Sequence, residues 1–412
     1  MRSLASYLRG LDPHLPRTVW VVQAGGVANA LGNGVVFPFA VIYLHNVRGI
    51  SFADAGFALA IGGAAALATG LVAGTLVDRV GGRNTLVLGL LVQAVAFTLF
   101  PLIREPWHAY ALFAVDGIGT ACFWPGQSTL LSRLTPAEDR HAAFALQRVT
   151  RNLGIGLGGL SGGLIATTEN ASSYTVLFVL DAATFVVFVG VLAFVPDPPI
   201  PSRTGAPAGR YVAVVRDRVF LGVVALNVLY VAAGYAVFEL LPVYAKNEVG
   251  VGERWIGVIF FVNTLAIVLA QLPLVKLLEG RRRMRALGFM TVVWALAWTI
   301  VLIGGVSATA GTAALVFCIG AIVFGIGECF HGPNQGALVA DMAPEWLRGR
   351  YMAFSTLSWE IGFAIGPAVG GLVLDRSPNA LWVLAACTCL VAGAGALVLE
   401  RRLAPELQLT PA

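Results

Sequence analysis

Residues 116–164 read DGIGTACFWPGQSTLLSRLTPAEDRHAAFALQRVTRNLGIGLGGLSGGL, and residues 324–372 read FGIGECFHGPNQGALVADMAPEWLRGRYMAFSTLSWEIGFAIGPAVGGL. The two stretches align without a gap, at a constant separation of 208 residues. Their identities fall mainly on glycines and prolines, which decide backbone geometry; Gly117 and Gly325 are one such pair. A duplicated, glycine-rich, apolar sequence predicts a membrane transporter built from two similar halves.

Composition places the chain in a membrane. Of its 412 residues, 58% are hydrophobic and 12% are charged, and the mean hydropathy is +0.80. This leaves too little polar surface for a soluble protein of that length. Apolar stretches long enough to cross ~30 Å of hydrocarbon predict an all-α membrane protein with twelve transmembrane helices in two pseudo-symmetric six-helix bundles. We expect these helices at residues 19–45, 52–78, 85–103, 107–133, 141–167, 173–195, 219–245, 254–279, 286–305, 310–341, 348–374 and 379–400.

The basic residues predict the orientation, because Lys and Arg near helix ends are retained on the cytoplasmic side. With both termini in the cytoplasm, most of the 27 Lys and Arg fall on the inner side. The exceptions are Arg48, Arg104, Lys246, Arg254 and Arg376 on the outer side, and Arg148 and Arg151 inside the fifth helix. The net charge of +5 is therefore a topology signal. It predicts anionic membrane lipids, and no nucleic acid, as partners, in the inner membrane of a bacterium.

The sequence divides at one linker. Residues 196–218 begin with a stretch rich in proline and small residues, which predicts a cytoplasmic connection between bundles at 1–195 and 219–412. The opening helices repeat as well, since FPFAVIYLHNVRG from Phe37 matches FELLPVYAKNEVG from Phe238. In that alignment Asn46 corresponds to Asn247.

The loop after the second helix carries a basic motif. Residues 74–86 read GTLVDRVGGRNTL, which resembles the loop 2–3 signature of the major facilitator superfamily. The matching positions are Gly74, Asp78, Arg79, Gly81 and Arg83, with Gly82 where the family often has arginine. We expect Gly74 to let two helices touch, and Arg79 and Arg83 to pair with carboxylates such as Glu138 or Asp139. The resemblance implies that this cluster latches the cytoplasmic side; the alternative is a basic turn that only sets topology.

A second motif lies in the fifth and eleventh helices. It consists of Gly154, Gly158, Gly162 and Gly163 in the first half, and of Gly362, Gly366, Pro367, Gly370 and Gly371 in the second. The pattern resembles the antiporter signature of drug exporters, complete only in the second half because Gly159 replaces the proline in the first. Small residues four apart also let a neighbouring backbone approach closely, so helix packing is the alternative. Together the motifs resemble bacterial multidrug, macrolide and siderophore exporters.

Charged residues inside the membrane are candidate functional groups, since each costs about 2.5 to 3.5 kcal/mol or more to insert. They are Asp116, Arg148, Arg151, Asp181, Glu239, Glu328 and Glu360. Acids outnumber arginines, which predicts that at least one acid is protonated at neutral pH or is neutralised by a cationic cargo.

The family resemblance implies that helices one, four, seven and ten line a central cavity, which places Asn29, Asn33, Asp116, Glu239 and Glu328 near the cargo. Among these, Glu328 is the first candidate for proton coupling, with His331 one turn away as a relay. Its alternative is a structural acid paired with an arginine of the fifth helix.

The other candidate proton carriers are Asp116, Glu239 and Glu360. Arg148 and Arg151 share one helix face; they bind an anionic cargo group or clamp Asp116 and Glu360 in a static network. Asp181 lies on a helix that the resemblance places outside the cavity, which favours a structural role.

These features predict a proton-coupled exporter of an amphipathic small molecule, such as a drug-like compound or a secondary metabolite, that works by alternating access. The alternative is an uptake or facilitative carrier of a sugar, an amino acid or an organic anion. No nucleophile, base and orienting group occur together in the sequence, so we do not expect an enzyme. We expect no metal and no cofactor, the proton gradient being the driving force, and the resemblance implies a monomer.

Overall fold

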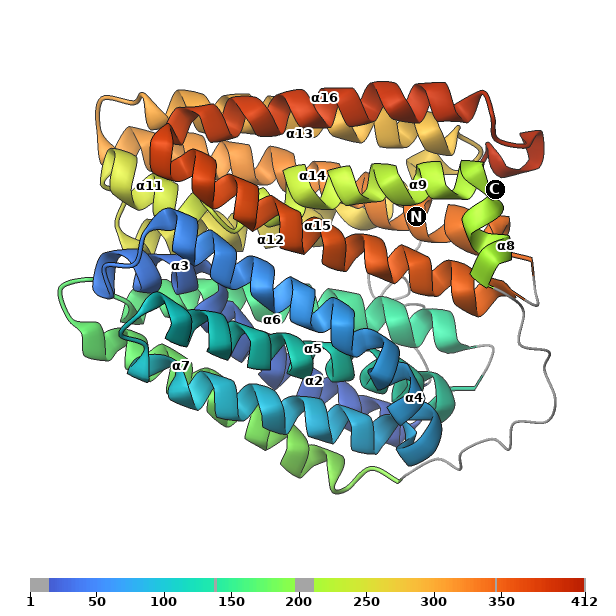
Figure 1. The fold of residues 1–412 in the computed structure, drawn as a ribbon, viewed down its shortest axis with the longest axis horizontal. Coiled ribbons are helices and arrows are strands. Elements are labelled where there is room, and N and C mark those ends of the chain that lie inside the picture. The colour runs from blue at the N-terminus through green and yellow to red at the C-terminus, as the bar shows by residue number, and fades with distance from the viewer. Residues whose placement is uncertain (1–14, 137–138, 197–210, 345–346, 411–412) are drawn as a thin grey trace, which may run out of the picture.

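The computed structural model of the protein describes residues 15–136, 139–196, 211–344 and 347–410. Across these residues the chain is helical and forms no named strand. Two helical bundles lie side by side with their long axes roughly aligned (Figure 1). The predicted all-α membrane fold is confirmed.

The first bundle contains the following elements: α2 (Arg17–Val36), η1 (Phe37–Phe39), α3 (Ala40–Ile42), η2 (Tyr43–Val47), α4 (Phe52–Leu99), η3 (Phe100–Leu102), α5 (Pro106–Leu134), α6 (Arg140–Ile165) and α7 (Ala171–Leu192). The second contains α9 (Arg218–Tyr230), η5 (Val231–Tyr235), α10 (Ala236–Phe238), α11 (Leu241–Val249), α12 (Glu253–Leu278), α13 (Arg283–Gly305), α14 (Ala310–Met342), α15 (Arg348–Arg376) and α16 (Pro378–Glu400). Ten helical stretches of the described chain are long and apolar enough to cross a membrane. The remaining two spans are α5 and α6, which are 29 and 26 residues long but more polar.

Helix α4 holds two spans joined by a sharp kink. At Gly81 the backbone adopts φ 87° and ψ 161°, a conformation open to glycine and strongly disfavoured for other residues. A Cβ atom added at the next residue, Gly82, would lie 2.9 Å from the carbonyl oxygen of Gly126. A side chain has no room at that point, which accounts for glycine where the family often has arginine.

The first and seventh spans are interrupted within the membrane. Helix α2 gives way to a 3₁₀ turn containing Pro38, and α9 passes through the π-helical turn η5 and the short α10 before α11 begins just ahead of Pro242. Interrupted backbone at membrane depth is tolerated where it is buried in protein or lines a cavity. The two breaks therefore mark the interior of the molecule.

The glycine motifs lie at the closest helix contacts. In α6, a Cβ at Gly154 would lie 2.7 Å from that of Ala30 on α2, within the same bundle. On the neighbouring face of α6, a Cβ at Gly163 would lie 3.1 Å from the Cα of Gly257 on α12, in the other bundle. The second copy repeats this arrangement, because Gly371 on α15 approaches Gly56 on α4 equally closely. The motifs thus pack helices both within and between bundles.

The bundles meet at one end and separate toward the other. A Cβ at Gly63 on α4 would lie 3.1 Å from the backbone nitrogen of Ala364 on α15, whereas no atom of the described residues lies within 4 Å of one at Gly70 or Gly74. We call the end with α3 and α11 the closed end, and the end with α8 and the C-terminus the open end (Figure 1). The helix contact expected at Gly74 is absent in this conformation.

Of the predicted linker that joins the bundles in sequence, residues 197–210 lie outside the described residues. The segment after them forms a short helix, α8 (Tyr211–Arg216), immediately before α9. The predicted linker 196–218 therefore contains regular structure near its C-terminal end.

Candidate functional site

A cavity of about 380 Å³ lies between the two bundles. Aromatic side chains form much of its apolar wall, including Phe37, Phe97, Phe113, Trp124 and Phe363. Such a wall suits a flat or amphipathic molecule, with the few polar groups in it setting orientation.

Four carboxyl groups belong to this wall. Asp116 comes from α5, Asp181 from α7, Glu239 from the break between α10 and α11, and Glu360 from α15. Asp116 Oδ1 accepts a hydrogen bond of 3.0 Å from Gln93 Nε2. Within the described chain, the carboxyl groups of Glu239 and Glu360 form no ion pair and no hydrogen bond. The expectation that Asp181 lies outside the cavity is wrong.

Arg151 is the cation of this cavity wall. Its guanidinium carbon lies 4.7 Å from the centre of the Trp124 ring, a cation–π contact that holds the side chain without neutralising it. The same two residues also border a side chamber of about 30 Å³. The predicted cavity residues Asn29 and Asn33 line this chamber, and Asn33 lines the central cavity as well.

Arg148 lies beside the second bundle and does not line either space. A Cβ at Gly332 on α14 would lie 2.8 Å from its Nη2 atom. Glu328 is also on α14, half-buried, with Arg148 and Asn263 as neighbours. In the part of the chain that the structure describes, no ion pair joins Arg148 or Arg151 to Asp116 or Glu360. The static clamp considered from sequence is not formed here.

His331 is held by a chain of hydrogen bonds. Its Nε2 lies 2.8 Å from Asn227 Oδ1 and its Nδ1 lies 3.2 Å from the hydroxyl of Tyr235. Asn227 donates from Nδ2 to Ser358 Oγ at 2.6 Å, so its Oδ1 is an acceptor and His331 Nε2 must carry the proton. His331 Nδ1 then accepts from Tyr235. Both nitrogens of a neutral ring are thereby occupied, and the relay expected between His331 and Glu328 is not seen.

The loop motif is tied to the first bundle. Arg83 Nε donates to the carbonyl oxygen of Leu192, at the end of α7, at 2.9 Å. Asp78 also has an interaction partner. Of the carboxylates expected to pair with this motif, Glu138 lies outside the described residues. The hydrogen bond of Arg83 fixes the kink at Gly81 against α7.

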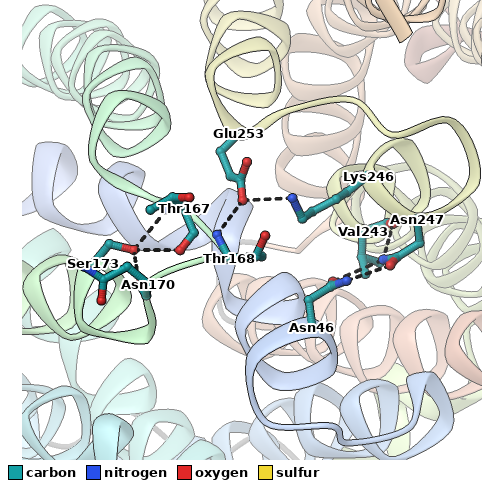
Figure 2. Close-up of polar contacts among 9 residues, drawn as sticks. All are labelled: Asn46, Thr167, Thr168, Asn170, Ser173, Val243, Lys246, Asn247 and Glu253. Atoms are coloured by element: carbon teal, nitrogen blue, oxygen red, sulfur yellow. Dashed lines mark hydrogen bonds and ion pairs between the residues drawn. The ribbon is translucent and has the colours of Figure 1, made fainter. Parts of the chain in front are cut away.

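Polar contacts join the bundles at the closed end (Figure 2). Asn46 Nδ2 donates to Asn247 Oδ1 at 2.6 Å, and Asn247 Nδ2 donates back to Asn46 Oδ1 at 3.1 Å. Glu253 Oε1 accepts from the backbone nitrogen of Thr168 in the first bundle and from Lys246 Nζ, both at 2.9 Å. Sequence reasoning matched the two asparagines as repeats without expecting contact, and it missed Glu253, which carries no motif.

Two six-helix bundles that enclose a cavity lined by carboxyl groups, joined at one end and apart at the other, define a polytopic membrane transporter of small molecules. Comparison with protein families is consistent with this class. The sequence profile of the Major Facilitator Superfamily matches residues 24–302 and 240–411. The chain belongs to the Major Facilitator Superfamily.

Individual relatives are distant. The chain is 28% identical over 396 residues to the multidrug resistance protein MdtH of Cronobacter sakazakii, covering 92% of this chain and 93% of that protein. A POT family transporter solved with 5-aminolevulinic acid superimposes with a TM-score of 0.77 at 15% identity, covering 94% and 96%. A bacterial homologue of the lysosomal transporter Spinster, solved inward-facing, gives 0.74 at 14% identity, covering 96% and 98%. At such identities the solved structures establish the fold alone.

Proposed function

We propose that the protein is a proton-coupled exporter of amphipathic organic cations that works by alternating access. The observation that carries this proposal is the cavity wall, where Glu239 and Glu360 line an aromatic-lined space and no cation among the described residues pairs with them. Uncompensated carboxylates in a membrane interior need a proton or a positively charged ligand. Aromatic rings around them favour a cation with apolar surface.

Exchange of the cargo for protons follows from the same carboxyl groups. A carboxyl group that holds a proton is neutral, so it cannot balance the positive charge of a bound cation. Cargo and protons therefore compete for these acids. A cation entering from one side then releases protons, and protons entering from the other side release the cation. This competition is sufficient for antiport when the cavity opens to one side at a time.

The distribution of basic residues supports an orientation with both termini in the cytoplasm of a bacterial cell. On that orientation the open end faces the cytoplasm and the conformation is inward-facing. An exporter loads its cargo in this state. The name of the MdtH relative, a multidrug resistance protein, supports export as the direction of transport.

A second function rests on Arg151. Its guanidinium lines the cavity and stacks on the ring of Trp124, so it could bind an anionic group of a metabolite. Solved relatives in fold include nucleoside and sugar transporters. The alternative is therefore an uptake carrier of an organic anion or another small metabolite.

Flux measurements distinguish these functions. The protein is reconstituted in liposomes with an acidic interior, and entry of two lipophilic cations, ethidium and tetraphenylphosphonium, is followed. We expect pH-driven accumulation of at least one cation, lost in Glu239→Gln and Glu360→Gln and retained in Glu248→Gln, an exposed acid at the closed end. Accumulation of labelled organic anions, sugars or amino acids without either cation would overturn the proposal.

A further inference from the structure

We infer that the cargo carries a carboxylate as well as its positive charge, and that the side chamber beside Arg151 is the binding site for this carboxylate. The inference rests on the proposed function, because it adds a second charged group to the cation that the cavity binds. The cargo is then a zwitterionic amphiphile, and its two charged groups contact different bundles.

The side chamber is small and polar. It lies among α2, α5 and α6 of the first bundle, and its volume is about 30 Å³, against about 380 Å³ for the central cavity. Among the described residues that line it, Arg151 is the one charged residue. The other polar side chains of its lining are amides and a hydroxyl, namely Gln23, Asn29, Asn33, Gln127, Gln147 and Thr150. A positive charge among side chains that can donate hydrogen bonds suits a small anionic group and disfavours a cation.

Three of the lining amides are buried. Gln23, Asn29 and Gln127 expose 4%, 3% and 5% of their surface. Gln23 Nε2 donates to the carbonyl oxygen of Ala143 on α6 at 3.0 Å, which fixes this side chain between α2 and α6. Asn29 Oδ1 has no donor among the described residues, and a buried oxygen of this kind needs one. A carboxylate with one bound water meets both needs, because the carboxylate accepts from Arg151 while the water donates to Asn29.

Arg151 lies at the junction of the chamber and the cavity. Together with Asn33, Trp124 and Ile155 it lines both spaces, so a molecule in the cavity can extend into the chamber. Its guanidinium carbon lies 4.7 Å from the centre of the Trp124 ring, and it forms no ion pair within the described chain. Stacking occupies one face of a guanidinium group and leaves the N–H groups at its edge for a carboxylate, which they bind in a bidentate manner.

The cation-binding acids lie on the other bundle. Arg151 belongs to the first bundle, whereas Glu239 and Glu360 belong to the second. The first bundle also contributes Asp116 and Asp181 to the cavity, but neither of them lines the chamber. A cargo with a positive charge alone leaves Arg151 without a counter-charge and close to a like charge, which is unfavourable. A zwitterionic cargo balances both bundles and keeps its apolar body against the aromatic wall.

Two fluorescent dyes that differ in one group test the site. Rhodamine B carries a free carboxylate beside its cationic ring system, and its ethyl ester has the same ring system without the negative charge. Binding of each dye to the purified protein in detergent at neutral pH is measured by fluorescence anisotropy. We expect rhodamine B to bind about ten-fold more tightly than the ester, because hydrogen bonds between charged groups are the strong ones. Equal affinities, tighter binding of the ester or no binding of rhodamine B would overturn the inference.

Two variants of the chamber locate the carboxylate. Arg151→Gln removes the charge, and Gly26→Ala adds a methyl group to the chamber lining, where a Cβ would lie 3.4 Å from Gln127 Nε2, an ordinary contact distance. We expect both variants to weaken binding of rhodamine B several-fold and to leave binding of the ester unchanged. Arg104→Gln replaces an exposed arginine that lines neither space and should change neither dye. An undiminished preference for rhodamine B in Gly26→Ala would overturn the inference even if Arg151→Gln fails to fold.

Failure of this inference and failure of the proposed function are distinguishable. The binding measurement needs no proton gradient, and the flux measurement with ethidium needs no carboxylate. Accumulation of ethidium driven by the pH gradient, without a preference for rhodamine B, would reject the zwitterionic cargo alone. A preference for rhodamine B that depends on Arg151, without pH-driven accumulation of either dye, would reject the proposed function alone.

Discussion

Single residues of similar chemistry have unequal surroundings in this protein. Glu239 and Glu360 line the cavity and have no ion-pair partner among the described residues, whereas Glu328 lies near Arg148 of the opposite bundle. We propose that these environments separate two roles: binding of cargo and protons at the cavity, and charge balance between the bundles. Glu328, the first candidate from sequence, fits the second role, because an arginine already lies near its charge.

His331 is expected to contribute to stability and not to pH dependence. Both ring nitrogens are bonded in the neutral state, and protonation would oppose the hydrogen bond from Tyr235. We predict that His331→Phe lowers the free energy of unfolding by about 1–3 kcal/mol, because it leaves buried partners unsatisfied. Thermal unfolding in detergent measures this loss. Flux at several pH values checks the second part, and a changed pH profile would restore His331 as a proton carrier.

The helices could be predicted from the sequence, whereas the breaks within them could not. Each predicted span has a counterpart because ~20 apolar residues are needed to cross the membrane whatever their partners. The interruption that exposes Glu239 was not predicted, and neither was the position of Asp181 in the cavity wall. Both depend on how each helix is rotated about its axis and packed against its neighbours. A helix that is apolar on all sides has no periodic pattern that shows which face is turned inward.

Contact between α4 and α15 is predicted to require a glycine at 371. A Cβ there would lie 3.0 Å from the Cα of Gly56 and would also clash with the carbonyl oxygen of Phe52. Gly371→Ala should therefore open the closed end and shift the population toward the opposite conformation. Gly70→Ala, on α4 where nothing lies within 4 Å, should not. Distances between spin labels on the two bundles report the shift; equal distributions in both variants would show that this contact does not hold the bundles.

The whole molecule is a pair of repeats that contact each other through equivalent residues at the closed end. Asn46 and Asn247 occupy equivalent positions in the two halves and bind each other reciprocally. Glu253 adds an asymmetric contact, because it reaches the backbone of Thr168 in the other bundle (Figure 2). Such contacts must break when the cavity opens at this end.

Loss of the Glu253 contact is predicted to favour the conformation open at that end. Glu253→Gln weakens the bond from Thr168 and removes the ion pair with Lys246, while Glu248→Gln removes an exposed charge nearby as a matched control. Cysteine pairs across the closed end should cross-link several-fold more slowly in the first variant and normally in the second. Unchanged cross-linking in Glu253→Gln would mean that packing alone closes this end.

The most direct test of the central claim, that cations and protons compete for the carboxyl groups of one cavity, is proton release on cargo binding. Ethidium or tetraphenylphosphonium is added to the purified protein in weakly buffered detergent, and the pH is followed with an indicator dye. We predict that binding releases protons and that Glu239→Gln with Glu360→Gln abolishes both binding and release. Cation binding without any release of protons would contradict the account.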